Sequence, residues 1–400
     1  MAQINKKMYG LGTVRSAIRD LFEYGNERAA IVGRENVYDY SLGNPSIEPP
    51  AKVGKTIIEL ESTMNPVSLH GYTSAAGDPQ VRAKIAADLN NRFGCTAAAG
   101  DFYMTCGAAA SLTISLTALK AGDDDEYIAI APFFPEYQVF AEATGAKFVV
   151  CPADEKHFQI DFDALERVIT SHTKGIIVDT PNNPSGTILT PENVKKLVDL
   201  LERKNAEYGH PIYLLADEPY RELVYDEGVK VPFFPNEYTY SIVCYSYSKS
   251  LSLPGERIGY IYVPSQMPDS AEIMAAVAGA GRALGFVCAP AMMQRVAAEC
   301  TDLTADLAAY KKNRDALYGA LTEMGFECVH PDGAFYIFMK CPGGDAQAFS
   351  KKAMEYDLLL VPSDSFGVAG YVRLAYCVSY DMIMRSIPVF RKLAEATLKA

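Results

Sequence analysis

One lysine, Lys249, lies among hydroxyl groups in the stretch YSYSKSLSLPGERIG (245–259), and Arg257 follows it eight positions later. The lysine comes directly after an apolar run that predicts a buried strand, and burial disfavours the ammonium form of an amine. A neutral amine is a nucleophile that can form an imine with an aldehyde. Ser246, Ser248 and Arg257 are suitable donors for a phosphate group. The common alternative is a solvated surface lysine.

Two other stretches that follow predicted strands are suited to a phosphate and to a flat ring. TCGAAAS places Gly107 and three small residues between a strand and a helix, where free backbone N–H groups can approach a phosphate. PFFPEY places Phe134 where it can stack on a heterocycle. A tight turn and a core phenylalanine are the alternatives, and neither stretch is decisive by itself.

Two more strand ends carry polar side chains that can face a ligand. TPNNPSG contains Asn183, which precedes a proline and is therefore biased toward an extended backbone. LLADEPY ends an apolar strand with Asp217, where a carboxylate is costly unless it is paired with a cation or hydrogen-bonded. Tyr220 follows three residues later. An ordinary turn and a structural ion pair are the alternatives.

These strand ends together suit one ligand, a flat cationic heterocycle that carries a phosphate, an aldehyde and a phenolic oxygen. Pyridoxal 5'-phosphate (PLP) is such a molecule, and it requires a Schiff-base lysine together with an acid at the ring nitrogen. The five histidines of the chain show no metal-ligand spacing, so no metal is predicted.

The elements that must position these residues alternate along the chain. Seven short runs rich in Val, Ile and Tyr are predicted strands, and segments of helical period lie between most of them. The strand candidates are DFYMT, EYIAIA, AKFVV, GIIVD, IYLLA, SIVCY and IGYIYV. This alternation predicts an α/β fold with a mainly parallel sheet covered by helices on both faces. Thr190 is a predicted N-cap of the helical segment 190–209.

The pattern changes near residue 290, which predicts a second, smaller domain. A long helical segment at 290–325 precedes the strand candidates AFYIFMK and YVRLAY. We therefore expect a large domain at 50–285 and a small α+β domain at 286–400. An N-terminal segment at 1–49, which contains a helical stretch, is expected to join the small domain.

Composition disfavours several classes of partner and compartment. The 400 residues include 49 acidic and 37 basic side chains, a formal net charge of -12, without a long block of either sign. Such a surface disfavours nucleic acids and anionic membranes. Nine cysteines without a CxxC pair indicate a reducing compartment. Because neither a secretion signal nor an apolar run of about 20 residues is found, a soluble cytoplasmic protein is expected.

The chain resembles the fold type I, class I/II PLP-dependent aminotransferases from about residue 38 to about residue 380. The most specific element is SxSKxxxxPGxRxG, which Ser246 to Gly259 match. Supporting matches, in the family's order, are YTSAAGDPQVR, NNPSG, DEPY, GAFYIF and SFGVAGYVRLAY.

The resemblance implies a role for each matched position around the cofactor ring. Lys249 would form the internal aldimine and then move a proton between the substrate Cα and the cofactor C4'. Asp217 would hold the pyridinium N–H, and Phe134 would stack on the ring. Asn183 and Tyr220 would bond the ring oxygen O3'.

The resemblance also implies a phosphate site and a homodimer. The implied phosphate ligands are the backbone at Gly107, Ala108 and Ala109 and the side chains of Ser246, Ser248 and Arg257. Because the two alanines stand where relatives often carry a hydroxyl, Ser111 is a further candidate. Tyr72 matches the tyrosine that reaches the phosphate of the neighbouring subunit, so shared sites are expected.

Substrate binding is implied at three positions. Arg373 matches the arginine that binds the α-carboxylate through two parallel hydrogen bonds, and the backbone at Gly43 would close over the same group, with Asn183 beside it. Arg282 is the nearby candidate for the second arginine that dicarboxylate enzymes use, and a helix-end surface charge is its alternative. Tyr137 belongs to the many aromatics that allow an aromatic donor, although a core position is the usual role of such residues.

The implied activity is transfer of the α-amino group of an L-amino acid to a 2-oxo acid. A carbon–sulfur β-lyase and an amino-acid decarboxylase are alternatives on the same scaffold. An effector-binding domain of a transcription regulator is disfavoured, because the segment before the loop SLGNPS is too short for a winged-helix module. The identities of the donor and the acceptor stay open.

Overall fold

The computed structural model describes residues 3–13 and 16–398, and the chain divides into two compact units. Unit 1 comprises residues 1–46, 309–331 and 335–400, and unit 2 comprises residues 47–308 and 332–334.

A seven-stranded sheet forms the centre of unit 2. Its strands are β2 (Phe102–Thr105), β3 (Glu126–Ile130), β4 (Lys147–Cys151), β5 (Thr173–Asp179), β6 (Tyr213–Asp217), β7 (Ser241–Ser246) and β8 (Gly259–Tyr262). The strand order is β2-β8-β7-β6-β5-β3-β4. β8 runs antiparallel to both of its neighbours, and the remaining pairs are parallel. All seven predicted strands are therefore present, and the prediction of a mainly parallel sheet is confirmed.

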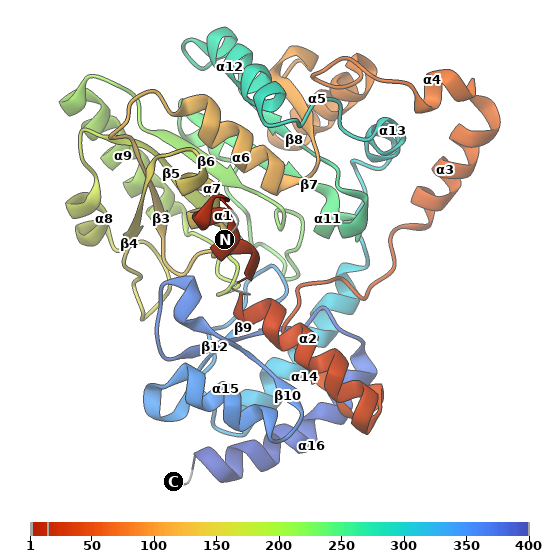
Figure 1. The fold of residues 1–400 in the computed structure, drawn as a ribbon, viewed down its shortest axis with the longest axis vertical. Coiled ribbons are helices and arrows are strands. Elements are labelled where there is room, and N and C mark those ends of the chain that lie inside the picture. Colours follow the sequence, from red (N-terminus) through yellow and green to blue (C-terminus); the bar gives the residue numbers. More distant parts are fainter. Residues whose placement is uncertain (1–2, 14–15, 399–400) are drawn as a thin grey trace. The chain divides into compact units, whose positions relative to one another are not determined.

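Helices cover both faces of this sheet (Figure 1). The helices of unit 2 are α3 (Ala51–Thr63), α4 (Pro66–His70), α5 (Pro79–Phe93), α6 (Ala108–Leu119), α7 (Glu136–Ala143), α8 (Phe162–Val168), α9 (Pro191–Tyr208), α10 (Phe234–Glu237), α11 (Tyr247–Ser250), α12 (Ser270–Ala283) and α13 (Ala291–Glu299), of which α3 and α4 project from the sheet rather than cover it. Val243 and Tyr245 of β7 pack in one core with residues of α5 and α13. Cys244, between them, points to the other face, where its Sγ lies 3.6 Å from Ser115 Oγ of α6.

One helix boundary follows the local signal that the sequence predicts, and another departs from the prediction. Thr190 caps α9, because its Oγ1 accepts a hydrogen bond from the Asn193 N–H (3.2 Å). The predicted helical segment 290–325 is instead two helices, α13 and α14 (Leu307–Glu323), separated by residues 300–306. In that break the Ala305 N–H donates to the Ser250 carbonyl (2.7 Å), so the backbone is bonded to α11 rather than within a helix.

The observed division differs from the predicted boundary at residue 286. Residues 286–308 belong to unit 2, because α13 packs against α3, α4 and α5 of that unit. The change from one unit to the other falls within the first turn of α14.

Unit 1 contains two small sheets and several helices. Its elements are α1 (Lys6–Thr13), α2 (Ala17–Val32), β1 (Tyr38–Asp39), most of α14, β9 (Tyr336–Lys340), α15 (Ala346–Met354), β10 (Leu358–Leu359), β11 (Val361–Pro362), β12 (Tyr371–Ala375) and α16 (Tyr380–Thr397). β12 lies between β11 and β9 in an antiparallel sheet, and β1 pairs with β10. The β1–β10 pairing and the ion pair of Arg28 with Asp357 (2.6 Å) connect the N-terminal segment to this unit.

No helix within residues 3–13 and 16–398 has both the length and the apolar composition that a membrane span requires.

Candidate active site

The C-terminal ends of β5, β6 and β7 lie side by side at one edge of the unit 2 sheet. Asp179 of β5 is in register with Asp217 of β6, and Asp217 is in register with Cys244 of β7. Lys249 follows β7 by three residues, on α11, and it is half-buried. The predicted acid and the predicted lysine thus belong to adjacent strand ends, the edge at which open α/β sheets bind ligands.

Asp217 is a buried carboxylate in which one oxygen has a partner. Its Oδ2 accepts a hydrogen bond from Tyr137 Oη (2.6 Å), whereas its buried Oδ1 has no hydrogen-bond partner among the described residues. Burial raises the pKa of Asp217 to about 7, the bond from Tyr137 lowers it, and the nearby Glu218 raises it. Because a buried carboxylate oxygen without a partner is costly, a ligand that carries a donor fits this position.

Asp179 is a second buried carboxylate, and it was not among the predicted site residues. Its Oδ2 accepts a hydrogen bond from the Asn183 backbone N–H (2.8 Å), and its Oδ1 lacks a partner within the described part of the chain. Burial, followed by the charge of Asp217, raises the pKa of Asp179 well above its usual value. The sequence contained the signal for it, because GIIVD ends an apolar strand with a carboxylate as LLAD does.

Phe134 and Tyr137 form an aromatic pair at the start of α7. Their ring centroids lie 5.7 Å apart in an edge-to-face arrangement. Phe134 keeps part of its surface exposed, whereas the adjacent Phe133 is buried against Phe148. Tyr137 is buried, as expected for a core aromatic, but its hydroxyl is bonded to Asp217. Sequence reasoning missed this second role, since nothing in the PFFPEY stretch indicates the partner of the hydroxyl.

Asn183 and Tyr220 lie on the loops that follow β5 and β6, and both are buried. Asp179 holds the Asn183 backbone through the bond described above. Burial and the charges of Asp179 and Asp217 raise the pKa of Tyr137 well above its usual value, and Tyr220 adds to this effect.

Ser246, Ser248 and Arg257 form a connected group of donors. Ser246 Oγ caps α11 by accepting a hydrogen bond from the Ser248 N–H (3.1 Å), and it lies 2.7 Å from Ser248 Oγ. Arg257 Nη1 donates to Ser248 Oγ (3.3 Å) and to the Pro254 carbonyl (3.1 Å).

The N-terminus of α6 adjoins this group at Gly107. Gly107 is the N-cap residue, with a φ of 86°, and no side chain caps the helix. A Cβ at Gly107 would lie 2.7 Å from Arg257 Nη2, so a larger residue would displace the guanidinium. Ala108 and Ala109 form the first turn, where N–H groups have no partner within the helix. The helix terminus, the two serines and Arg257 provide the donors that a phosphate requires.

Ser111 does not belong to this group of donors. It is fully buried, its Oγ lies 2.7 Å from Thr105 Oγ1, and it donates to the Tyr260 carbonyl (3.2 Å). Ser111 therefore bonds the sheet beneath α6.

Gly43 and Arg373 belong to unit 1. Arg373 lies on β12 and is 2% exposed, and its Nη2 donates to the Ser41 carbonyl. The guanidinium lies over the rings of Tyr336 (4.7 Å) and Phe366 (5.2 Å), contacts that stabilise a buried cation. A Cβ at Gly43 would clash with Tyr336 Oη, so the backbone at Gly43 lies close to the same aromatic ring.

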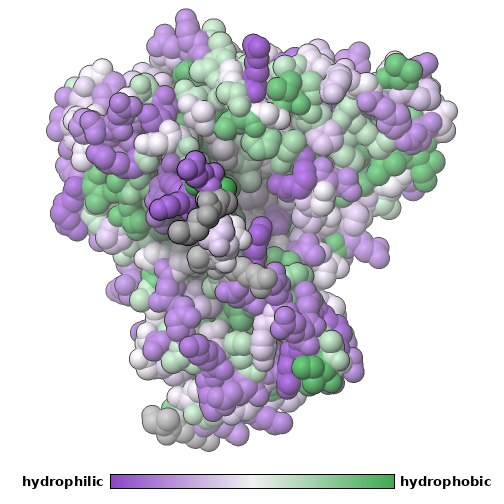
Figure 2. All heavy atoms as spheres, viewed as in Figure 1, coloured by the Kyte–Doolittle hydropathy of each residue, from purple (hydrophilic) through white to green (hydrophobic). Residues whose placement is uncertain are grey.

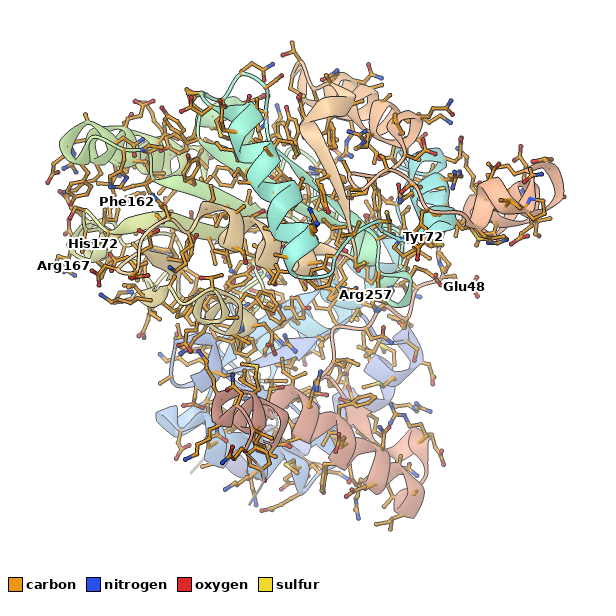
Figure 3. The ribbon with its side chains drawn as sticks, turned by 45° about the horizontal axis from the view of Figure 1, so that its top comes forward. Glu48, Tyr72, Phe162, Arg167, His172 and Arg257 are labelled. Carbon is orange, nitrogen blue, oxygen red and sulfur yellow. The ribbon has the colours of Figure 1, made fainter. Side chains whose placement is uncertain are left out.

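Tyr72 lies on the loop between α4 and α5, and 98% of its surface is exposed (Figure 3). It follows an arm formed by α3 and α4, which projects from the sheet of unit 2 (Figure 1). The arm exposes Ile58 and Val67, and Figure 2 shows hydrophobic side chains among polar ones at its end. Arg282, on the last turn of α12, is also exposed.

The aminotransferase class I and II family matches residues 35–387, which include both carboxylates, the lysine and the phosphate-type donors. The chain belongs to this family. It is 56% identical to the aminotransferase from Eubacterium rectale, whose crystal structure it matches with a TM-score of 0.97 over 99% of this chain and 100% of that one. It is also 30% identical to a probable N-acetyl-LL-diaminopimelate aminotransferase of Bacillus subtilis (89% of each chain). A probable aspartate aminotransferase of Methanocaldococcus jannaschii is 28% identical (95% of this chain, 97% of the relative).

This aminotransferase thus has the fold and the enzyme class that its sequence predicts. Aminotransferases of the family use PLP, which has a ring N–H, a phosphate and an aldehyde. The buried Oδ1 of Asp217 and the donors around Gly107 fit the first two of these groups, and an amine at Lys249 fits the third.

Proposed function

We propose that this aminotransferase binds PLP in unit 2, with Lys249 as the covalent partner, and moves the α-amino group of an L-amino acid to a 2-oxo acid. The observation that supports the proposal most is the buried Oδ1 of Asp217, whose carboxylate ends a strand next to the one that leads to Lys249. A ring N–H is the donor that this oxygen would accept.

When bound, PLP supplies an aldehyde that links to amines and a ring that withdraws electrons from the substrate Cα. Lys249 Nζ would bind the aldehyde carbon, leave it when the substrate amine arrives, and then accept the proton from the substrate Cα. Asp217 Oδ1 would accept the ring N–H and keep it protonated, while Tyr137 holds the opposite carboxylate oxygen.

The remaining residues of unit 2 would orient the ring and its phosphate. Asn183 Nδ2 and Tyr220 Oη would donate to the phenolic oxygen, and Phe134 would stack on the ring face. The phosphate would be bound by the backbone of Gly107, Ala108 and Ala109 and by the side chains of Ser246, Ser248 and Arg257. Arg257 already bonds Ser248, so little reorganisation is needed when the phosphate binds.

The substrate α-carboxylate would be bound by Arg373, with the backbone at Gly43 as a further donor. The rings of Tyr336 and Phe366 contact the guanidinium of Arg373. A guanidinium can bind a carboxylate through two parallel hydrogen bonds.

We propose further that two copies of the chain form a homodimer in which Tyr72 reaches the phosphate of the partner subunit. An almost fully exposed tyrosine and the apolar residues of the arm support this assembly, because such side chains gain most from burial in an interface. The nine thiols fit a reducing, cytoplasmic location.

A panel of amino donors tests the reaction, and the absorbance of the bound cofactor reports each half-reaction. L-aspartate and N-acetyl-LL-diaminopimelate belong in the panel because relatives are named for them, and aromatic donors should be included as well. The acceptors are 2-oxoglutarate, pyruvate and oxaloacetate. The proposal expects the donor to release its matching 2-oxo acid in the first half-reaction. The absorbance of the aldehyde form of the cofactor should then recover fully only after an acceptor is added. Release of pyruvate or carbon dioxide without an acceptor would instead indicate a β-lyase or a decarboxylase.

A further inference from the structure

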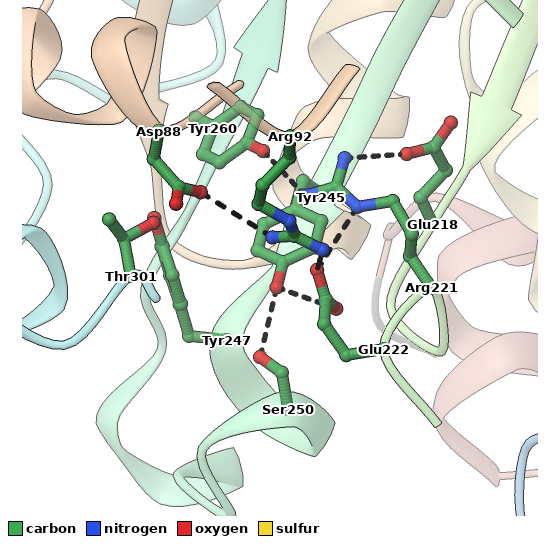
Figure 4. A network of polar contacts seen from close by, with 10 residues as sticks. All are labelled: Asp88, Arg92, Glu218, Arg221, Glu222, Tyr245, Tyr247, Ser250, Tyr260 and Thr301. Atoms are coloured by element: carbon green, nitrogen blue, oxygen red, sulfur yellow. Dashed lines mark hydrogen bonds and ion pairs between the residues drawn. The ribbon is translucent and has the colours of Figure 1, made fainter. Parts of the chain in front are cut away.

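A cluster of charged side chains, most of them buried, lies in unit 2 (Figure 4). The ion cluster consists of Asp88, Arg92, Glu218, Arg221 and Glu222. Arg221 bonds Glu218 (2.8 Å) and Glu222 (3.1 Å), and Arg92 bonds Glu222 (2.9 Å) and Asp88 (3.4 Å). The side chains of Arg221 and Glu218 are only 3% and 2% exposed, so these charges have lost nearly all their water.

The hydroxyl of Tyr245 connects the ion cluster to the helix that carries Lys249. Tyr245 Oη donates to Glu222 Oε2 (2.9 Å) and lies 2.9 Å from Ser250 Oγ. The Arg221 guanidinium lies 4.3 Å above the Tyr245 ring. Burial raises the pKa of Tyr245 well above its usual value, so the phenol keeps the proton that bonds the carboxylate.

The members of this network are chain neighbours of the proposed cofactor ligands. Glu218 directly follows Asp217, and Arg221 directly follows Tyr220. On the segment formed by β7 and α11, Ser250 directly follows Lys249, and Tyr245 directly precedes Ser246. Because adjacent residues share a peptide bond, a network that holds its own members in place also restricts the backbone of the proposed cofactor ligands next to them.

Stability alone is a weak explanation for such a network. Removing charges from water is costly, and well-packed apolar side chains often stabilise a core equally well. A hydrogen-bonded network fixes two segments in one geometry better than apolar side chains do. Hydrogen bonds are directional, whereas contacts between apolar side chains are not.

We propose that Arg221, Glu222 and Tyr245 are positioning residues, which hold the loop after β6 and helix α11 in one relative arrangement. This inference rests on the proposed function, since the segments it joins carry Asp217, Tyr220 and Lys249. The three residues themselves do not contact the cofactor in this assignment. Their effect reaches it through the adjoining backbone.

The test compares Tyr245→Phe with Tyr238→Phe, a matched control. Tyr238 is equally buried in unit 2, and its hydroxyl also has two partners, the Ile212 carbonyl (2.7 Å) and Asn205 Nδ2 (2.7 Å). Both variants lose one buried hydroxyl with two bonds, so a similar loss of thermal stability is expected in each. Ser250→Ala removes the Tyr245–Ser250 contact from the other side and serves as a second variant if Tyr245→Phe does not fold.

Three readouts distinguish positioning from simple stabilisation. In the cofactor-free protein, amide hydrogen exchange of the 246–252 segment should accelerate in Tyr245→Phe and Ser250→Ala, and should not change in Tyr238→Phe. The first two variants should bind PLP about tenfold more weakly, the effect of breaking a contact within one network. The ratio of the visible absorption bands of the bound cofactor should also change in these two variants at fixed pH.

The proposal is overturned if Tyr245→Phe and Ser250→Ala match Tyr238→Phe in exchange and in the absorption bands. The proposal is also overturned if only one of the variants Tyr245→Phe and Ser250→Ala shows these changes, because both variants remove the same contact. Absence of any cofactor band in the wild-type protein would instead refute the proposed function, and the exchange experiment would still report on the network.

Discussion

Two adjacent buried carboxylates predict that the cofactor-free protein loses stability as the pH rises. The pKa of Asp217 is about 7 in the folded protein, against 3.8 for the ordinary side chain. Since one pKa unit corresponds to about 1.4 kcal/mol, this difference amounts to about 4 kcal/mol of folding free energy. A raised carboxyl pKa means that the folded protein holds a proton that the unfolded chain has released. The free energy of unfolding therefore falls between about pH 4 and about pH 7, and the loss is complete above that range.

The perturbation is Asp217→Asn, which keeps the shape of the side chain and removes its titration. Relative to the wild type, this variant should be equally stable near pH 4 and up to about 4 kcal/mol more stable above about pH 7, without cofactor. Asp179→Asn should act in the same direction, because each carboxylate raises the cost of charging the other. Asp124→Asn is the control, since Asp124 is an exposed residue whose charge is screened by solvent.

Urea unfolding of cofactor-free protein across this pH range measures the effect. Addition of PLP should remove the part of the pH dependence that Asp217 causes, because a ring N–H at Oδ1 would keep Asp217 ionised. A raised pKa of Asp217 is refuted if Asp217→Asn is no more stable than the wild type above about pH 7, or if Asp124→Asn shows the same gain in stability.

Three further predictions concern single contacts. Gly107→Ala should destabilise the protein by about 1–3 kcal/mol in thermal unfolding and weaken PLP binding in a titration, because a Cβ at a φ of 86° is strained and meets Arg257. Arg373→Lys should raise the KM for the amino donor about tenfold or more in steady-state kinetics and leave the absorption bands of the bound cofactor unchanged, since lysine cannot make two parallel hydrogen bonds. Thr190→Ala should cost about 1 kcal/mol in urea unfolding, through loss of the bond from the Asn193 N–H, with an unchanged kcat/KM.

The sequence predicts the large sheet well because its strands carry strong local signals. Each is a short apolar run bounded by turn residues, and period and length alone separate it from the helices around it. Candidate residues such as Asp217 were found for the same reason, since a carboxylate that ends a buried strand requires a partner. The break at 300–306 was missed because its bonding partner, Ser250, lies about 55 residues earlier in the chain.

The parts of the site that depend on long-range register were not predictable. The pairing of Asp179 with Asp217 requires the register of β5 and β6, which no local pattern specifies. The ion cluster likewise joins residues 88 and 92 of α5 to residues 218–222 after β6. Its members look like ordinary solvated charges in sequence, because burial of a charge is a property of the assembled core.

The covalent attachment of PLP at Lys249 is the central claim, and borohydride reduction tests it most directly. Protein saturated with PLP is reduced, digested and mapped by mass spectrometry. We expect a stable pyridoxyl adduct on the peptide that contains Lys249, and a much weaker signal after prior incubation with an amino donor. An unmodified Lys249 peptide, or an adduct confined to other lysines, would contradict the account.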